Sequence, residues 1–146
     1  MKTFLTFAFL AIATFSAFSQ ANSTHILSMK DRAETIDRLL EDKIQNYLPE
    51  IMRREGVDMW VVMSREYNED PVIKTLLPAT WLAARRRTIL IMFDRGEKEG
   101  IESIAVARYD VGSSFKSAWN PEEQPNQWAR VAESIKERNP KKIAVN

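Results

Sequence analysis

The sequence predicts an α/β domain built around a mixed β-sheet. An apolar run over residues 57–63 is short and rich in β-branched and aromatic side chains, and it follows a long helical pattern. Two further apolar runs, 87–94 and 101–109, are joined by a polar turn bounded by glycines. A helical segment at 126–138 then leads to a last strand near 141–146. This order of helix, strand, hairpin, helix and strand is typical of a sheet that is covered by helices.

Residues 57–63 predict a central strand that is buried on both faces. Apart from Asp58 the run is apolar without alternation, whereas a strand facing solvent on one side would alternate apolar and polar residues. The pair Val61–Val62 at its centre makes a helix the poorer interpretation. Gly56 stands directly before the run, and glycine is the residue that most often ends a helix. A helix is therefore expected to end at Gly56 and to lead into a buried strand.

An amphipathic helix is predicted over residues 31–55. Its apolar side chains follow the three-and-four spacing of one helical face, at Ile36, Leu39, Leu40, Ile44, Tyr47, Leu48, Ile51 and Met52. Pro49 has no amide hydrogen to donate in the middle of a helix. We therefore expect either a kink at Pro49 or two helices, the second with Pro49 in its first turn.

A polar segment, residues 64–71, lies at the carboxyl end of the predicted central strand, where the ligands of open α/β sheets tend to bind. A structural alternative is that Asp70 caps a short helix that begins at Pro71 and runs through Leu77. Trp81, in the apolar loop that follows, is either a core residue or an exposed contact residue. For the run Arg85–Arg87, the alternative to a functional role is a solvated entrance to the next strand.

The remaining elements complete the sheet. Residues 87–109 predict an antiparallel hairpin, because a turn of this length joins neighbouring strands. Residues 111–127 show no sustained period and predict a packed loop. The helix at 126–138 should stop at Asn139–Pro140, and a right-handed crossover would then place the last strand beside the central one and parallel to it.

The first residues resemble a secretory signal peptide. Lys2 supplies a positive charge, residues 4–18 are apolar, and small residues follow that allow cleavage after Ser19 or after Ala21. The apolar run is shorter than the roughly 20 residues that span a bilayer, so a permanent anchor is the weaker alternative and no stable membrane insertion is expected. Residues 1–21 are thus predicted to be a signal peptide and residues 22–30 a flexible leader, in a secreted or periplasmic protein.

Composition excludes several classes of function. Loss of Lys2 with the signal peptide reduces Lys+Arg from 21 to 20, equal to the 20 acidic residues, which argues against a nucleic-acid partner. With no cysteine and His25 as the one histidine, zinc sites of the usual kind and thiol nucleophiles are excluded. There is no phosphate-binding glycine loop and no Gly-x-Ser-x-Gly motif. An all-carboxylate metal site remains open.

Four segments follow one another in a distinctive order: Arg32–Glu34 before the amphipathic helix, Leu48–Val62, the strand Arg87–Asp94, and the Trp128 helix leading to Lys142–Asn146. In this order they resemble the amino-terminal domain of the creatinase, prolidase and Xaa-Pro aminopeptidase family, in its secreted bacterial form. The resemblance covers residues 31–146. It implies a three-layer, ribonuclease-H-like fold with a mixed sheet and no catalytic or metal-binding residues of its own. In this family, a separate carboxyl-terminal "pita-bread" domain holds two divalent metals, and the chain is expected to be truncated before it.

The resemblance also implies a role. Such domains border the catalytic cleft, restrict it to short peptides, and often form dimer contacts. Short proline-containing peptides are expected as partners only of the full-length enzyme. The residues expected at such a cleft or interface, from their position alone, are Arg65, Tyr67, Asp70, Trp81 and Arg85. Expected partners are the carboxyl-terminal catalytic domain and a second copy in a homodimer, with no cofactor in this chain. Two alternatives stay open: a stand-alone secreted interaction domain, and a small carboxylate-metal hydrolase.

Overall fold

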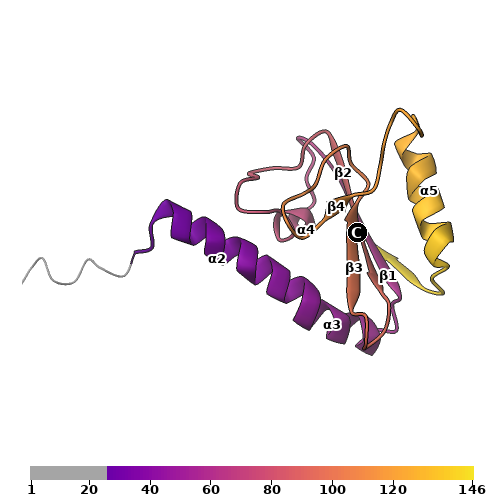
Figure 1. The fold of residues 1–146 in the computed structure, drawn as a ribbon, viewed down its shortest axis with the longest axis horizontal. Helices are drawn as coiled ribbons and strands as arrows, with labels where there is room; N and C mark the ends of the chain where they lie inside the picture. Colours follow the sequence, from indigo (N-terminus) through magenta and orange to yellow (C-terminus); the bar gives the residue numbers. More distant parts are fainter. Residues whose placement is uncertain (1–25) are drawn as a thin grey trace, which may run out of the picture. The chain divides into compact units, whose positions relative to one another are not determined.

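The computed structural model describes residues 26–146 (Figure 1). Residues 32–146 form one compact unit, to which the description below refers. The elements along the chain are α2 (Met29–Asp42), η1 (Lys43–Tyr47), α3 (Leu48–Arg54), β1 (Met59–Arg65), α4 (Pro71–Lys74), β2 (Arg87–Asp94), β3 (Ile101–Ala105), β4 (Lys116–Ser117), α5 (Gln127–Arg138) and β5 (Ile143–Val145). The predicted signal peptide and His25 lie outside the described residues.

The sheet is mixed, as predicted. Its five strands run in the order β4-β3-β2-β1-β5. The pairs β1–β2 and β2–β3 are antiparallel, which confirms the predicted hairpin, and β5 lies beside β1 and parallel to it. The chain reaches β5 through α5, and the predicted place of the last strand, beside β1 and parallel to it, is confirmed. The strand predicted as central, β1, is an interior strand, but the middle position belongs to β2.

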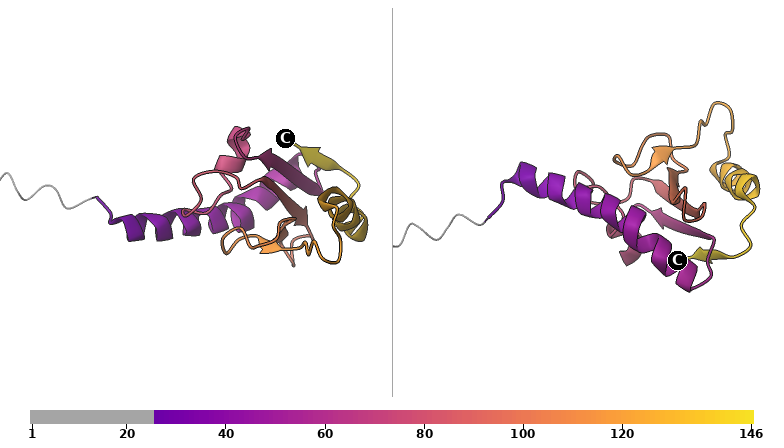
Figure 2. Two further views of the ribbon diagram at one scale, coloured as in Figure 1. Left: turned by 90° about the horizontal axis from the view of Figure 1, so that it is seen from above. Right: turned by 60° about the horizontal axis from the view of Figure 1, so that its bottom comes forward.

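Helices cover both faces of the sheet (Figures 1 and 2). Side chains alternate along β1: Val62 packs toward α2, η1 and α3, whereas Met59 and Val61 pack toward α5. The same alternation in β2 places Leu90 and Met92 on the face toward α2, η1 and α3. It places their neighbours Ile89 and Ile91 on the face toward α5. Both faces of β1 and β2 are therefore buried, which is why their sequences read as continuous apolar runs.

Pro49 is accommodated by a change of helix type. The five residues of η1 form a π-helical segment, and α3 then begins with Pro49 in its first turn. The wider π turn suits a proline, which lacks an amide hydrogen and crowds the carbonyl four residues earlier. The expectation of a second helix with Pro49 at its start is confirmed, and in Figure 2 that helix continues the direction of α2.

Several boundaries differ from prediction for local reasons. β1 begins at Met59 instead of residue 57, because Asp58 turns its carboxylate to the chain before β5, where Oδ2 accepts the Lys141 and Lys142 amides at 2.7 and 2.8 Å. α4 ends at Lys74, short of Leu77. The stretch predicted as loop contains the two-residue strand β4, which pairs with the end of β3.

Two helix ends follow the sequence signals. Gly56 has φ of +62°, and the Val57 and Gly56 amides donate to the carbonyls of Met52 and Arg53 at the end of α3. Asn126 caps α5 by accepting the amides of the following turn, and Asn139, in the left-handed region, ends it. Within the described residues, no helix combines the length and the apolar character needed to cross a bilayer.

Candidate functional site

Several of the residues predicted to be functional gather at one end of the sheet. Arg65 ends β1 and Arg87 begins the antiparallel β2, so the two are register partners. The loops beyond them are joined as well. The Glu66 amide donates to the Arg86 carbonyl at 2.6 Å, and the Arg86 amide donates to the Glu66 carboxylate at 3.1 Å. The loop after β1 and the loop before β2 therefore form one continuous surface.

Trp81 and Arg85 lie in direct contact on this surface. The Arg85 guanidinium carbon is 4.3 Å from the centroid of the Trp81 ring, which is cation–π geometry. Tyr109, from the loop after β3, meets the same indole edge-on, with ring centroids 5.7 Å apart. Trp81 is half-buried and also packs against the core, so both alternatives predicted for it hold in part.

Two further arginines stack on tryptophans on the α5 side of the sheet, the face opposite the core cluster against which Trp81 packs. The Arg87 guanidinium lies 4.9 Å from the Trp128 ring on α5, and that of Arg108 lies 5.9 Å from the Trp119 ring. A solvated strand entrance was one interpretation of Arg85–Arg87, whereas Arg108, Tyr109 and these two indoles were not predicted to be site residues. We call the whole set the guanidinium–indole surface: Arg65, Arg85, Arg87, Arg108, Trp81, Trp119, Trp128 and Tyr109.

The arginines form a row across three strands. Alternation puts Arg65 on the same face as Met63, and Arg87 on the same face as Ile89, which is the α5 face. The hydrogen bond from the Val106 amide to the Ile89 carbonyl extends the β2–β3 register toward Arg108. Like charges directly opposite one another in a sheet are unfavourable. Within residues 26–146, no carboxylate lies within ion-pair distance of the four guanidinium groups, so this end of the sheet suits an anionic partner.

The other two predicted residues have different positions. Asp70 caps α4, its carboxylate accepting the Val72 amide at 2.7 Å, so the structural alternative for Asp70 is confirmed. Tyr67 has a positive φ of 66° in a tight turn and is 93% exposed. In the described part of the chain no hydrogen bond or ring contact involves its side chain. Neither residue belongs to the guanidinium–indole surface.

These features were compared with those of known proteins. No family model, curated protein or solved structure matches the chain. The chemistry of the side chains themselves is therefore the basis for inferring function.

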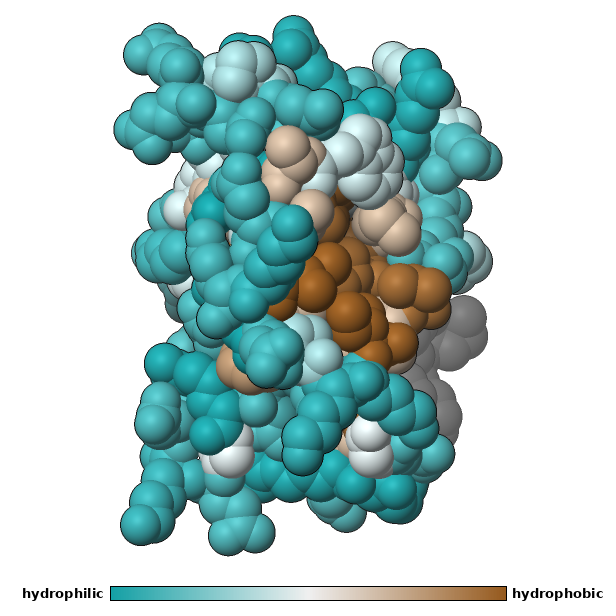
Figure 3. Space-filling model, turned by 90° about the vertical axis from the view of Figure 1, so that its right-hand side faces the viewer, coloured by the Kyte–Doolittle hydropathy of each residue, from teal (hydrophilic) through white to brown (hydrophobic). Residues whose placement is uncertain are grey.

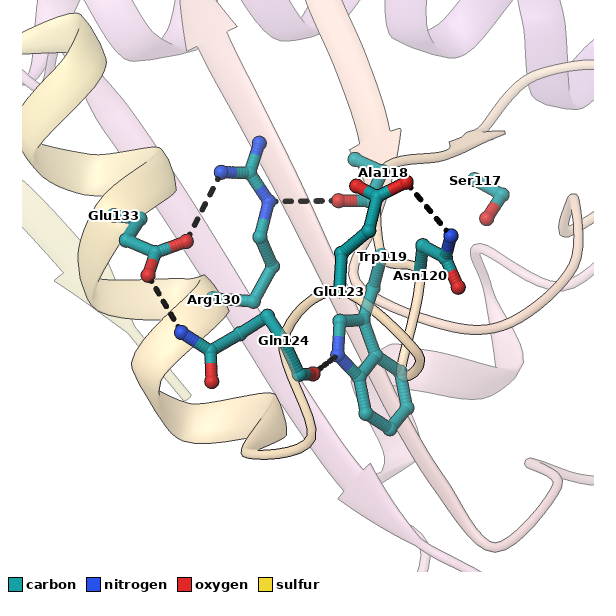
Figure 4. Close-up of a pocket in the computed structure, with 8 residues that line it drawn as sticks. All are labelled: Ser117, Ala118, Trp119, Asn120, Glu123, Gln124, Arg130 and Glu133. Carbon is teal, nitrogen blue, oxygen red and sulfur yellow. Dashed lines mark hydrogen bonds and ion pairs between the residues drawn. The ribbon is translucent and has the colours of Figure 1, made fainter.

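A hollow near this surface lies between the loop after β4 and α5, and its volume is about 550 Å³ (Figure 4). Its lining residues are Ser117, Ala118, Trp119, Asn120, Glu123, Gln124, Arg130 and Glu133.

Hydrogen bonds within the hollow use most of its polar groups. Arg130 Nε donates to the Ala118 carbonyl at 2.8 Å, and Gln124 Nε2 donates to Glu133 at 2.8 Å. The Trp119 indole donates to the Gln124 carbonyl at 2.6 Å. Ion pairs with Glu137 and Glu133 raise the pKa of Arg130 above its usual value. These bonds hold the loop on α5 and explain the hollow structurally.

Among the described residues, no group of three acidic or histidine side chains could hold a metal ion. Ser64 and Ser134 have buried hydroxyls without a hydrogen-bond partner, so neither is paired with a base that could activate it. The Ser117 amide and Lys116 lower the pKa of Asp110, which keeps this carboxylate ionised rather than poised for proton transfer.

The sequence signals the residues that were not predicted only indirectly, through the register of the strands. Arg65, Arg87 and Arg108 each stand at the same end of neighbouring strands once the register is known. The register itself is set by which apolar residues face which helix. Stacking of an arginine on an indole depends on loop geometry, which spacing alone does not encode.

Proposed function

We propose that residues 32–146 are the non-catalytic amino-terminal domain of a secreted Xaa-Pro aminopeptidase-like metallopeptidase, a domain that shapes substrate access. The observation that carries the proposal is the guanidinium–indole surface at the carboxyl end of β1. It offers guanidinium groups and flat aromatic faces side by side, and it has no catalytic group.

This chemistry suits a short proline-containing peptide. Proline-rich segments bind to aromatic surfaces, where the rigid ring packs flat on an indole. Arginine binds a terminal carboxylate with two parallel hydrogen bonds. Trp81 with Arg85 supplies both groups within one contact of 4.3 Å. When a peptide enters a neighbouring catalytic cleft, Trp81 would contact its proline and Arg85 would bind its carboxyl terminus. These two contacts would decide which peptides reach the cleft.

The fold proposed for this domain is the ribonuclease-H-like, three-layer type. The proposal is supported by a mixed five-stranded sheet with an antiparallel β1–β2–β3 hairpin series and a parallel strand reached through a helix. Helices on both faces of that sheet are also what a three-layer fold requires.

A partner domain has an apolar area to pack against. Ile143 and Val145 are 40% and 63% exposed on edge strand β5, and their register with Met59 and Val61 puts them on the α5 face. Figure 3, which views that face, shows an apolar area framed by hydrophilic side chains. We propose the carboxyl-terminal catalytic domain as its partner, with two divalent metals bound in that domain and none in this one.

The family assignment is tested by the gene. The nucleotide sequence past the codon for Asn146 should continue in frame and encode an Asp, Asp, His, Glu, Glu set of metal ligands, the set that two-metal hydrolysis uses in this family. A stop codon at that point, with no such set in a neighbouring frame, would contradict the proposal. It would favour a stand-alone secreted interaction domain that uses the same surface.

Peptide binding tests the surface. We expect the purified chain to bind the dipeptide alanyl-proline weakly, with chemical-shift changes at the Trp81 indole signal in NMR. Arg85→Met should weaken binding by about tenfold, because it removes a charge-assisted hydrogen bond to the carboxylate. Amidating the peptide should have the same effect on the unmodified protein.

The matched control is Arg54→Met, an exposed arginine on α3 whose one ion pair among residues 26–146 is with its neighbour Glu55. It should leave binding unchanged. Equal affinity of the Arg85→Met variant and the unmodified protein would remove Arg85 from the proposed site.

A further inference from the structure

Three arginines of the guanidinium–indole surface lie on one face of the sheet, the face toward α5. We call them the arginine row: Arg65, Arg87 and Arg108. Arg65 and Arg87 are register partners on adjacent strands, which lie about 4.8 Å apart. The Val106 amide donates to the Ile89 carbonyl at 2.8 Å, which continues the pairing of the next strand toward Arg108. The row therefore crosses one end of three adjacent strands.

Indoles hold two of the three guanidinium groups in place. The Arg87 group lies 4.9 Å from the Trp128 ring, and the Arg108 group lies 5.9 Å from the Trp119 ring, which packs on the α5 side of the sheet. A guanidinium that stacks by its face keeps the N–H groups on its edge free to bind an anion. Because stacking already restricts these side chains, a ligand loses less binding energy in ordering them.

Gln127, at the start of α5, fixes the backbone beside the row. Its Nε2 donates to the carbonyls of Arg87 and Val106, at 3.2 and 2.6 Å, and so ties the start of β2 and the chain after β3 to the helix. Its Oε1 accepts from Arg87 Nη1 at 3.5 Å, which is a long hydrogen bond. Among the described residues, the three guanidinium groups of the row donate this hydrogen bond alone, so most of their N–H groups are available.

The two carboxylates that follow arginines of the row most closely in the sequence have other partners. The Glu66 carboxylate accepts the Arg86 amide at 3.1 Å. The Asp110 carboxylate accepts Lys116 Nζ at 3.0 Å and the Ser117 amide at 2.7 Å. Within residues 26–146, no ion pair involves the row. Three positive charges thus lie together without a paired negative charge from these residues.

We propose that the arginine row binds a ligand through a diphosphate group, which belongs either to free pyrophosphate or to a nucleotide. Guanidinium groups bind phosphate oxygens through two parallel hydrogen bonds. A phosphate group carries about 1.5 to 2 negative charges at pH 7, so one group leaves the row partly uncompensated and two linked groups balance it. This inference stands independently of the function proposed above, because Trp81 packs against the core cluster on the opposite face of the sheet.

The backbone amides at the start of α5 do not add to this site. Asn126 Oδ1 accepts the amides of Trp128 and Ala129, at 2.9 and 3.3 Å. Binding therefore depends on the guanidinium groups, and the removal of one of them should have a large effect.

Calorimetric titration of the purified chain with sodium pyrophosphate tests the site. At low salt we expect a Kd of about 100 μM. Inorganic phosphate and succinate should bind at least about tenfold more weakly, because the first has one phosphate group and the second has only carboxylates. If either of them bound as tightly as pyrophosphate, the diphosphate assignment would be wrong.

Adenosine diphosphate, in the same titration, separates the two sources of the diphosphate. Tighter binding than that of pyrophosphate would identify a nucleotide as the ligand, whereas equal or weaker binding would show that the diphosphate is the whole recognised group. In NMR spectra, either ligand should shift the indole signals of Trp119 and Trp128 and leave that of Trp81 unchanged. A shift at Trp81 alone would contradict the placement on the α5 face.

Two variants remove guanidinium groups from the row. Arg87→Met and Arg108→Met should each raise the Kd for pyrophosphate by about tenfold, because each removes charge-assisted hydrogen bonds to phosphate. Circular dichroism should show that both are folded, and either one suffices for the test if the other is not. Arg54→Met is the matched control, since it removes the same charge from an exposed position on α3 and should leave the Kd unchanged.

Three results would overturn the proposal. The first is no heat of binding at millimolar pyrophosphate. The second is a folded row variant that binds pyrophosphate as tightly as the unmodified protein does. The third is an equal loss of affinity in Arg54→Met, which would show that binding follows net charge and not the row. None of these results bears on the peptide site at Trp81, which is measured with alanyl-proline.

Discussion

Gly112→Ala should reduce the free energy of unfolding by about 3 kcal/mol, through left-handed backbone strain and steric overlap together. Gly112 has φ of +64°, a conformation that side chains disfavour. A Cβ atom there would lie 2.8 Å from Cβ of Pro78 and 3.2 Å from its Cγ. Pro78 is itself buried, so it has little room to move away. Urea denaturation, followed by tryptophan fluorescence, measures the loss.

Gly56→Ala is the matched control. Gly56 has nearly the same φ, +62°, but nothing lies within 4 Å of the position where a Cβ would be added. This change should therefore cost about 1 kcal/mol, from backbone strain alone. The difference between the two variants isolates the contact with Pro78. Equal losses at the two glycines would show that the loop yields at Pro78.

The contact between Gly112 and Pro78 also affects the guanidinium–indole surface. Gly112 belongs to the loop that carries Arg108 and Tyr109, and Pro78 opens the loop that carries Trp81. Their close approach fixes the distance at which Tyr109 meets the Trp81 indole. A displaced loop would separate the two rings, so we expect Gly112→Ala to weaken peptide binding as well as stability.

Much of the fold could be predicted because its signals are local or periodic. Apolar runs without alternation marked β1 and β2 as strands buried on two faces. Glycine at 56 and Asn139–Pro140 marked helix ends through their backbone preferences. The crossover rule then gave the position of β5. Each of these inferences needs only a few neighbouring residues or a general rule of chain geometry.

The site was predicted less completely because it depends on contacts between distant segments. Arg65, Trp81 and Arg85 were selected from their position after β1. Tyr109 and Trp128 join them only through the register of three strands and the placement of α5. The apolar face of the helix was predicted incompletely for a similar reason. Ile36, Leu39, Tyr47 and Ile51 are 48%, 57%, 60% and 45% exposed, because a periodic pattern shows which residues are apolar but the π turn decides which of them face the sheet.

A long-range ion pair that the sequence does not signal fastens α5 to the sheet. Arg138 Nη2 and Nε donate to the two carboxylate oxygens of Glu102 on β3, at 2.6 and 2.8 Å. The side chains are 14% and 29% exposed. The paired geometry and partial burial make it stronger than a typical surface ion pair. The hydrogen bonds from Arg138 lower the pKa of Glu102, and this outweighs the opposing effect of desolvation.

Arg138→Met should therefore destabilise the protein by about 1–2 kcal/mol at neutral pH, a value reduced by the water that still reaches the pair. Methionine keeps an unbranched apolar stem but donates no hydrogen bond. Because the folded pKa of Glu102 lies below the unfolded value, its contribution is complete at pH values above the unfolded pKa and disappears as pH falls through the folded pKa. The difference in unfolding free energy between the two proteins should thus shrink steadily in acid.

Urea denaturation of both proteins from pH 7 to pH 3 measures this convergence. Arg54→Met provides the control again, since its ion pair with Glu55 is 66% and 60% exposed and should contribute less than 0.5 kcal/mol at any pH, roughly the limit for such surface pairs. The difference in unfolding free energy between Arg138→Met and the unmodified protein could instead stay constant with pH. That result would mean that Arg138 acts through its packing. In that case the shorter of its two other hydrogen bonds, to the Ser134 carbonyl at 2.9 Å, would be the contact to remove next.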